Sequence, residues 1–252
     1  FGFGFSSTNI TNLVSSSGVV ATDTTGVGTS RHGLAAAGYG GDKAIFGYGA
    51  GVTNLTNLVS NSGVVATDTT GVGTARIVLA AASYGGDKAI FGYGDSGGDT
   101  YVSMSNLVSS SGVVADDVTG VGTGRSGLAA TGYGGDKAIF GYGYNSSARV
   151  SMSNLVSNSG VVATDVSGVG TARDSSAATG YGGDKGIFGY GDTGSKVSLT
   201  NLVSNTGVVS SDVTGVGTAR RGLAAAGYGG DKAIFGYGTT ASNVSMTNLV
   251  SN

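Results

Sequence analysis

The sequence is organised around one stretch, Ala224-Ala225-Ala226-Gly227-Tyr228-Gly229-Gly230-Asp231-Lys232-Ala233-Ile234-Phe235-Gly236-Tyr237-Gly238. Closely related copies end at Gly49, Gly94, Gly143 and Gly191, so the stretch occurs five times. In each copy two short apolar runs flank a Gly-Gly-Asp-Lys turn, a pattern that predicts a β-hairpin. The chain therefore consists of this hairpin and a second one, repeated.

The composition of the 252-residue chain favours strands over helices. The sequence holds 50 glycines at fixed positions of the repeat, and it has no Pro, Cys, Trp, Glu or Gln. Without Glu and Gln, and with Val, Thr, Ser and Gly throughout, helix propensity is poor, and strand and turn chemistry dominate. We predict an all-β fold in a single repeat domain, residues 1–252, because stacked repeats share one continuous core.

Charge and hydropathy exclude several classes of partner. The net charge of −2, with no basic run, argues against nucleic-acid binding, which needs a patch that neutralises phosphates. No apolar stretch approaches the roughly 20 residues of a membrane helix, so no membrane insertion is expected. Zero Cys excludes disulfides and thiolate chemistry. Residue 1 is Phe, which is expected of a processed chain or a piece of a longer one.

The repeat is marked by five arginines, and the spacings between them are 45, 49, 48 and 47 residues: Arg31, Arg76, Arg125, Arg173 and Arg220. A period of about 40–50 residues with several short strands is typical of propeller blades. Each unit offers four strand candidates, which in one unit are residues 33–39, 43–48, 56–60 and 63–67. The first is rich in Ala and Gly, which suits a crowded strand near an axis, and the second carries the bulky residues. We predict a β-propeller of four-stranded antiparallel blades.

The layout resembles the kelch-type β-propeller repeat. The residues that carry the resemblance are Arg220-Arg221-Gly222-Leu223-Ala224-Ala225-Ala226, followed by Asp231 to Gly238. The resemblance spans nearly the whole chain and implies blades with two further outer strands. Two features depart from the family's pattern: its strand-four Trp is absent, and its double Gly appears as Gly-Tyr-Gly. The amino-acid sequence of the repeats is also loosely similar to repeat arrays of phage tail and virion proteins.

The number of blades depends on the surplus strands at the two ends of the chain. Phe1 to Gly4 matches the end of strand two, and the last residues, 244–252, match strand three. We favour five blades, with residues 18–22 closing the ring as strand four of the last blade. Six blades would leave the first without an inner strand. As a third alternative, the surplus segment pairs with a neighbouring molecule, giving a dimer or a filament.

Variation between the repeats is confined to two places. From each Arg to the Gly that ends strand two there are always 18 positions, whereas the gap from that Gly to the Asn of Asn-Leu-Val is 8, 8, 12, 11, 10 or 10. Identity varies most in this loop and directly after each Arg. Counting strand directions places both at one end of the blades, here called the variable face. Loops on a rigid scaffold usually carry binding specificity. Neutral drift of loops is the alternative, against which stands the near-constancy of the turns at the opposite end.

We predict a non-enzymatic binding or adhesion module that recognises a glycan or a protein surface, located outside the cell or on a virion. Exposed Tyr, here Tyr101 and Tyr144, is a common contact for such ligands. A structural repeat protein that assembles into a fibre or a shell is the alternative. The predicted ligand-binding residues are His32, Asp95, Asp99, Tyr101, Ser126, Tyr144, Asn145, Arg149, Asp174, Asp192, Lys196, Arg221 and Asn243.

No catalytic residue, metal ligand or cofactor is predicted. The single His, His32, permits no multi-histidine site, and abundant Ser makes a match to a catalytic triad uninformative. The ten Asp that recur by unit lie in turn signatures, where Asp commonly bonds its own backbone. The five repeated Arg are expected to bridge neighbouring blades, although a ring of Arg would also suit an anionic ligand.

Overall fold

The structure is a computed structural model and describes residues 2–4 and 8–251. These residues form seventeen strands and no helix, which confirms the all-β prediction. The strands make six antiparallel sheets, of which five have three strands and one has two. We number them along the chain: sheet 1 (β1-β2), sheet 2 (β3-β4-β5), sheet 3 (β6-β7-β8), sheet 4 (β9-β10-β11), sheet 5 (β12-β13-β14) and sheet 6 (β15-β16-β17).

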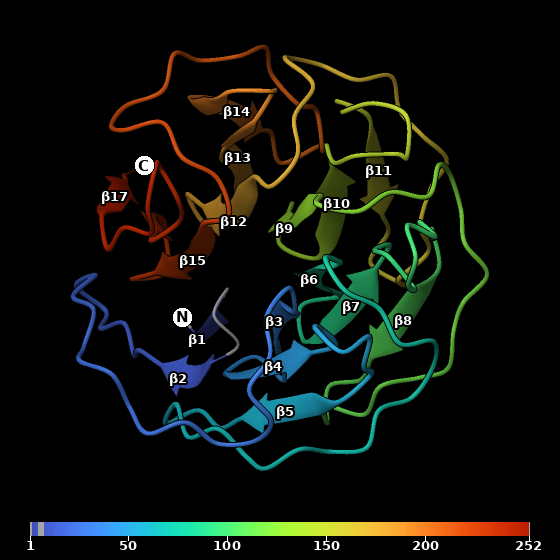
Figure 1. Cartoon of the computed structure of the whole chain (residues 1–252), viewed down its shortest axis with the longest axis vertical. Helices are drawn as coiled ribbons and strands as arrows, with labels where there is room; N and C mark the ends of the chain where they lie inside the picture. The colour runs from blue at the N-terminus through green and yellow to red at the C-terminus, as the bar shows by residue number, and fades with distance from the viewer. Residues whose placement is uncertain (1, 5–7, 252) are drawn as a thin grey trace.

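The strand bounds repeat with the sequence. They are β1 Gly2–Gly4, β2 Thr8–Thr11, β3 Ala35–Tyr39, β4 Lys43–Gly47, β5 Thr56–Val59, β6 Ala80–Tyr84, β7 Lys88–Gly92, β8 Ser105–Val108, β9 Ala129–Tyr133, β10 Lys137–Gly141, β11 Ser153–Val156, β12 Ala177–Tyr181, β13 Lys185–Asp192, β14 Lys196–Val203, β15 Ala224–Tyr228, β16 Lys232–Gly236 and β17 Thr247–Val250. Figure 1 shows the sheets arranged around a common centre, with the Ala-rich strands β3, β6, β9, β12 and β15 nearest to it.

The prediction of a fourth strand in each blade is wrong. In sheet 2 this segment meets β5 through isolated bridges, Val59 with Val65 and Thr56 with Thr69. Three positions separate the two bridges on β5, but four separate them on the other segment, so one extra residue interrupts the ladder. The Asn57 side chain substitutes for part of the lost pairing, because its Nδ2 donates to the Ala66 carbonyl at 3.1 Å. The sheets are therefore three-stranded, with an irregular outer segment.

The preference for five blades is also wrong, because the chain forms six sheets. Residues 18–22 do not join the last unit: the bridges Val14 with Val20 and Thr11 with Thr24 hold them on sheet 1. An asparagine holds these residues as Asn57 does in sheet 2, since Asn12 Nδ2 donates to the Ala21 carbonyl at 3.1 Å. Among the described residues no sheet combines strands of the first and last units.

The Phe-Gly-Tyr motif of the second strand packs neighbouring sheets together. At Gly92 in sheet 3, a Cβ would lie 2.7 Å from Cζ of Phe140 in sheet 4, so the phenyl ring needs a glycine beneath it. The next residue, Tyr93, has a φ of 64° and places its ring 5.1 Å from that of Phe140, edge to face. Phe140 is fully buried. The glycine therefore serves close packing between sheets.

The near-constant Gly-Gly-Asp-Lys turns join each sheet to the next through the backbone. The Gly40 N–H of sheet 2 donates to the Asp87 carbonyl of sheet 3 at 2.6 Å, and Gly85 donates to Asp136 at 2.7 Å. Two further bonds of this kind, Gly134 to Asp184 and Gly182 to Asp231, continue what we call the turn series. The constancy of these turns thus has a structural cause at this end of the sheets.

Candidate functional site

The two variable places of the repeat lie directly opposite each other. In sheets 3 to 6, the residue after the repeated Arg forms a bridge with the first residue of the variable loop: Ile77 with Asp95, Ser126 with Tyr144, Asp174 with Asp192 and Arg221 with Thr239. In sheet 2 the Ala50 N–H donates to the His32 carbonyl at 2.7 Å. The differences between the units are therefore concentrated in paired positions at one end of each sheet.

A chain of backbone hydrogen bonds links the variable ends of neighbouring sheets. Val78 N–H donates to the Gly33 carbonyl, and Gly127 N–H donates to the Val78 carbonyl. Ser175 and Gly222 extend the same pattern into sheets 5 and 6, giving what we call the face series. All five residues have φ between 54° and 64°. Val78 is the most strained, because a β-branched residue rarely adopts the left-handed conformation.

An aromatic pair joins the loops of sheets 3 and 4. The rings of Tyr101 and Tyr144 lie 6.0 Å apart, with an angle of 82° between their planes. The Tyr101 hydroxyl donates to Asp99 Oδ1 at 3.2 Å, and burial followed by the charge of Asp99 raises the pKa of Tyr101. Tyr144 is paired through the backbone with Ser126 of its own sheet. The structure thus brings four predicted site residues into one cluster, here called the tyrosine cluster: Asp99, Tyr101, Ser126 and Tyr144.

A second group of predicted residues forms an ion-pair network across sheets 4, 5 and 6. Arg149 Nε lies 2.6 Å from Asp174 Oδ1, and its Nη2 lies 3.1 Å from Asp192 Oδ1. Arg221 Nη1 lies 2.8 Å from the other oxygen of Asp192. Burial alone would raise the pKa of Asp192, but the Gly194 N–H and the two arginines outweigh it, so the pKa is lowered. This arginine–aspartate network largely neutralises itself.

The remaining predicted residues are used within their own loops. Asp95 Oδ1 accepts from the Gly97 N–H at 2.8 Å, and Asn145 Oδ1 accepts from the Ala148 N–H at 3.0 Å. Asn243 Oδ1 accepts from the Thr239 hydroxyl at 3.0 Å. Lys196 pairs with Asp192 through the β13–β14 ladder. These contacts shape the loops, so the tyrosine cluster and the arginine–aspartate network are the places where side chains of several sheets meet.

The five repeated arginines are buried between sheets, as the bridging interpretation expects. Arg125 donates from Nε to the Tyr142 carbonyl at 2.9 Å, and from Nη2 to Asn154 Oδ1 at 2.7 Å. Its guanidinium lies 4.3 Å from the ring centre of Tyr93 in the preceding sheet. Burial lowers the pKa of Arg125, while Tyr93 and Asp165 act in the opposite direction. These side chains hold the sheets together and are not presented to an anionic ligand.

Sequence reasoning missed the asparagine that anchors each arginine. Asn154 is fully buried, accepts from Arg125 and donates from Nδ2 to Asp165 Oδ1 at 2.9 Å. Asp165 also accepts from the N–H and the hydroxyl of Thr123. The available signal was the constant spacing of 11 residues from the Asn of Asn-Leu-Val to the recurring Asp that accepts from it. The recurring Asp of this set is therefore an inter-segment acceptor and not simply a turn residue.

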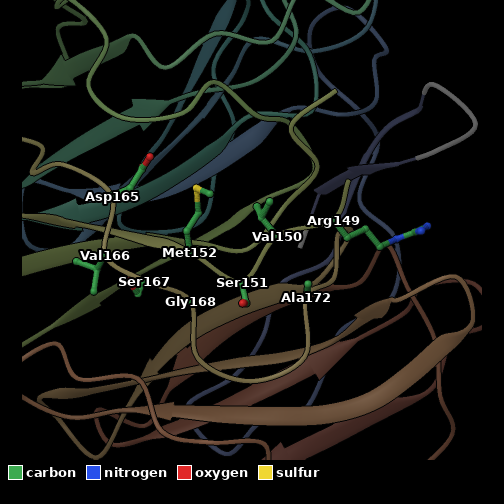
Figure 2. Close-up of a pocket in the computed structure, with 9 residues that line it drawn as sticks. All are labelled: Arg149, Val150, Ser151, Met152, Asp165, Val166, Ser167, Gly168 and Ala172. Carbon is green, nitrogen blue, oxygen red and sulfur yellow. The ribbon is translucent and has the colours of Figure 1, made fainter. Parts of the chain in front are cut away.

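A shallow cavity of about 460 Å³ lies beside the variable loop of sheet 4. Figure 2 shows its lining, which runs from Arg149 through Val150, Ser151 and Met152 to the irregular outer segment near Asp165. Both charged residues are already engaged, Arg149 with Asp174 and Asp165 with Thr123. Each charged side chain of the lining therefore already has a partner of its own.

Within residues 2–4 and 8–251, no group of three or more His, Cys, Asp or Glu is placed to hold a metal ion. In the same part of the chain, no helix is long and apolar enough to cross a membrane.

Comparison with known proteins gives no family assignment. No protein-family model matches the chain, and no curated protein is similar to it in sequence. Together with the three-stranded sheets, this overturns the resemblance to the kelch-type repeat, and the looser likeness to phage tail and virion repeats has no support. The molecule is thus characterised by its own architecture, tandem all-β units whose differences lie in paired loops at one end.

Proposed function

We propose that the chain is a non-enzymatic binding module whose variable face recognises a glycan or a protein surface. One observation carries the proposal: the residue after each Arg and the first residue of each loop, the two places where the units differ, are bridged to each other in sheets 3 to 6. A protein with this function would be located outside the cell or on the surface of a virion.

The scaffold below these loops is well suited to hold them in place. The Arg side chains are buried, and the turn series ties the opposite ends of the sheets together. Constancy of the turns therefore follows from structure and no longer argues against neutral drift. Support comes instead from what the loops present, because they gather aromatic and charged side chains from adjacent sheets.

The tyrosine cluster suggests the chemistry of the ligand. Tyr101 and Tyr144 are partly exposed aromatic residues that pack edge to face, and Asp99 accepts from the Tyr101 hydroxyl. Ring faces combined with polar groups suit both sugars and protein side chains. The arginine–aspartate network beside them carries two cations and two carboxylates, so no strong preference for a charged ligand is expected.

We also propose that the six sheets form a closed ring. A Cβ at Gly112 of sheet 3 would lie 2.9 Å from the Tyr39 ring of sheet 2. A Cβ at Gly18 of sheet 1 would lie 3.0 Å from the Tyr228 ring of sheet 6. The contact between neighbouring sheets thus recurs between the last sheet and the first, which supports closure by packing.

Loop exchange tests the binding proposal. Residues 144–148 are replaced by residues 239–242, which keeps Arg149 and its ion pairs, and binding to a glycan array and a protein panel is measured. A changed ligand profile with a nearly unchanged melting temperature is expected, whereas Lys137→Ala, at the other end of the sheet, should leave the profile as it was. Identical binding of wild type and exchange variant to every ligand would refute the proposal.

A structural role in an assembly is the second candidate, favoured by one repeated feature. The same valine in each outer segment is 65% exposed: Val19, Val64, Val113, Val161 and Val208. Regularly spaced exposed apolar residues suit contacts between copies. Ordered polymers in light scattering that dissolve in a variant with these five valines changed to Ser would favour this role. A monomer at all concentrations would exclude it.

A further inference from the structure

The edge of β1 differs from the edges of all other middle strands. β1 corresponds to the middle strands β4, β7, β10, β13 and β16, because a Cβ at Gly2 would meet Phe46 as one at Gly47 would meet Phe91. Arg31 likewise lies over the Phe3 ring as Arg76 lies over the Tyr48 ring. Each of the other five middle strands pairs with two neighbours. On one side lies the inner strand (β3, β6, β9, β12 or β15), and on the other lies the outer strand (β5, β8, β11, β14 or β17). In the described part of the chain, β1 pairs with β2 alone.

The inner strands on either side of this edge are more exposed than those within the array. In β9 every residue is buried or partly buried, whereas Ala36 and Gly38 of β3 and Ala224 and Gly227 of β15 are exposed. Figure 1 shows sheet 1 between the sheets that contain β15 and β3. The exposed small residues of these two strands therefore flank the β1 edge.

Both backbone series end at this place. The face series runs from Gly33 to Gly222, leaving the Gly33 N–H at one end and the Gly222 carbonyl at the other. The turn series runs from Gly40 to Asp231, with the Asp42 carbonyl and the Gly229 N–H as its ends. A strand that continued both series would lie between β15 and β3 and use all four groups.

In sheets 2 to 5, an aspartate of the outer segment accepts from the Thr and lies close to the Arg that precede the inner strand, and sheet 1 carries an equivalent aspartate. In sheet 2, Asp68 accepts from the Thr29 hydroxyl at 2.6 Å and lies 3.5 Å from Arg31. In sheet 1 the matching residue is Asp23, which accepts from Asn12 Nδ2 at 2.8 Å, as Asp68 does from Asn57. Asp23 also acts on Tyr237 of sheet 6, since burial and then the charge of Asp23 raise the pKa of that residue.

We propose that the β1 edge, between β15 and β3, binds an extended peptide of the inner-strand type. Its chemistry is read from the five inner strands of this chain: an Arg, a Tyr eight positions later, small residues before the Tyr, and a Gly-Gly-Asp turn after it. The Arg pairs with Asp23, and the backbone adds to β1 as a further strand. Main-chain bonds give such strand addition its affinity, and side-chain pockets give it specificity.

The test uses the whole protein and a synthetic peptide with the sequence of residues 218–231. Saturable binding of one peptide per chain, measured by calorimetry, is expected, together with slower amide exchange at residues 2–4. A peptide with Arg220→Ala should bind at least about tenfold more weakly, since it loses a charge-assisted contact. Undetectable binding, or equal binding of both peptides, would overturn the proposal.

A protein variant separates this site from the variable face. Asp23→Asn should weaken peptide binding at least about tenfold, because it removes the charge that pairs with the Arg of the peptide. Asp23 is exposed, so the variant is expected to keep its fold. Asp99→Asn, in the tyrosine cluster, should bind the peptide as wild type does. An Asp23→Asn variant with full affinity would contradict the proposal. If the free protein dimerises and the peptide dissociates the dimer, a second copy supplies the strand, which supports it.

Discussion

The guanidinium carbon of Arg125 lies 4.3 Å from the ring centre of Tyr93, which belongs to the preceding sheet. Equivalent contacts join Arg76 to Tyr48 and Arg173 to Tyr142 at 4.7 and 4.0 Å. The arginine donates a hydrogen bond to Asn154 of its own sheet and packs on the Tyr93 ring of the neighbouring sheet. One side chain thus contributes to its own sheet and also fixes the position of that sheet relative to the preceding one.

Arg125→Ala is expected to lower the free energy of unfolding by about 3 kcal/mol, because it leaves Asn154 and the Tyr142 carbonyl without a buried donor. Urea unfolding followed by circular dichroism measures the change. Lys137→Ala, at the partly exposed start of β10 in the same sheet, is the matched control and should stay within about 0.5 kcal/mol of wild type. Equal effects of the two variants would contradict the role given to Arg125.

Gly92→Ala is expected to destabilise the protein by about 1–3 kcal/mol, because the new methyl group would lie 2.7 Å from Phe140. Gly180→Ala provides the comparison, since its Cβ would be 3.6 Å from the Lys185 carbonyl, an ordinary contact. That variant should be neutral or slightly stabilising, as Gly in a strand interior carries an entropic cost. Thermal unfolding distinguishes the two, and equal melting temperatures would count against the packing argument.

Val78→Gly is expected to stabilise the protein by roughly 1 kcal/mol, because Val78 has a φ of 55° and three of the four equivalent residues are glycine. The side chain is 39% exposed, so only part of its surface is removed from contact by the change. Differential scanning calorimetry should show a higher melting temperature. A lower one would mean that the contacts of the valine outweigh its backbone strain.

Stability is expected to fall on acidification through the recurring aspartates. Burial would raise the pKa of Asp165, but hydrogen bonds from Thr123 and Asn154 outweigh it, so its folded pKa is lowered. Its contribution is therefore complete above the unfolded pKa of about 3.9 and is lost as the pH falls through the folded value. Asp68, Asp117 and Asp212 behave alike.

Asp165→Asn should accordingly lower the free energy of unfolding at pH 7 and change it less at pH 2. Urea unfolding at the two pH values measures this, with Asp99→Asn as a control on an exposed loop. A difference from wild type that is the same at both pH values would show that the carboxylate charge is not what matters.

The sequence predicted those features that depend on local pattern. The hairpin around Gly229-Gly230-Asp231-Lys232 and the small inner strands follow from turn chemistry and composition, and both are present. The fourth strand was not predictable in this way, because its Val-rich run favours a strand while one extra residue against β5 breaks the ladder. Strand propensity does not reveal register.

The candidate site was predictable as a set of places and not as a set of contacts. Length variation identified the loops that contain Tyr101 and Tyr144, but their pairing arises from the packing of sheets 3 and 4. The arginine–aspartate network also needs three sheets, since Asp192 lies between Arg149 and Arg221. The buried role of Asn154 was hidden because Asn is ordinarily a surface residue.

The constant lengths on either side of each loop have a consequence for how such a protein diversifies. Crossing over between two copies of the gene segment from Arg to the closing Gly always restores 18 positions, and so yields an intact hairpin with a correctly placed arginine and phenylalanine. Because each sheet contacts its immediate neighbours, the stability of the product is close to a sum of local terms. Unequal recombination can therefore shuffle loops as interchangeable cassettes, while each product keeps the hairpins and buried arginines that hold the sheets together.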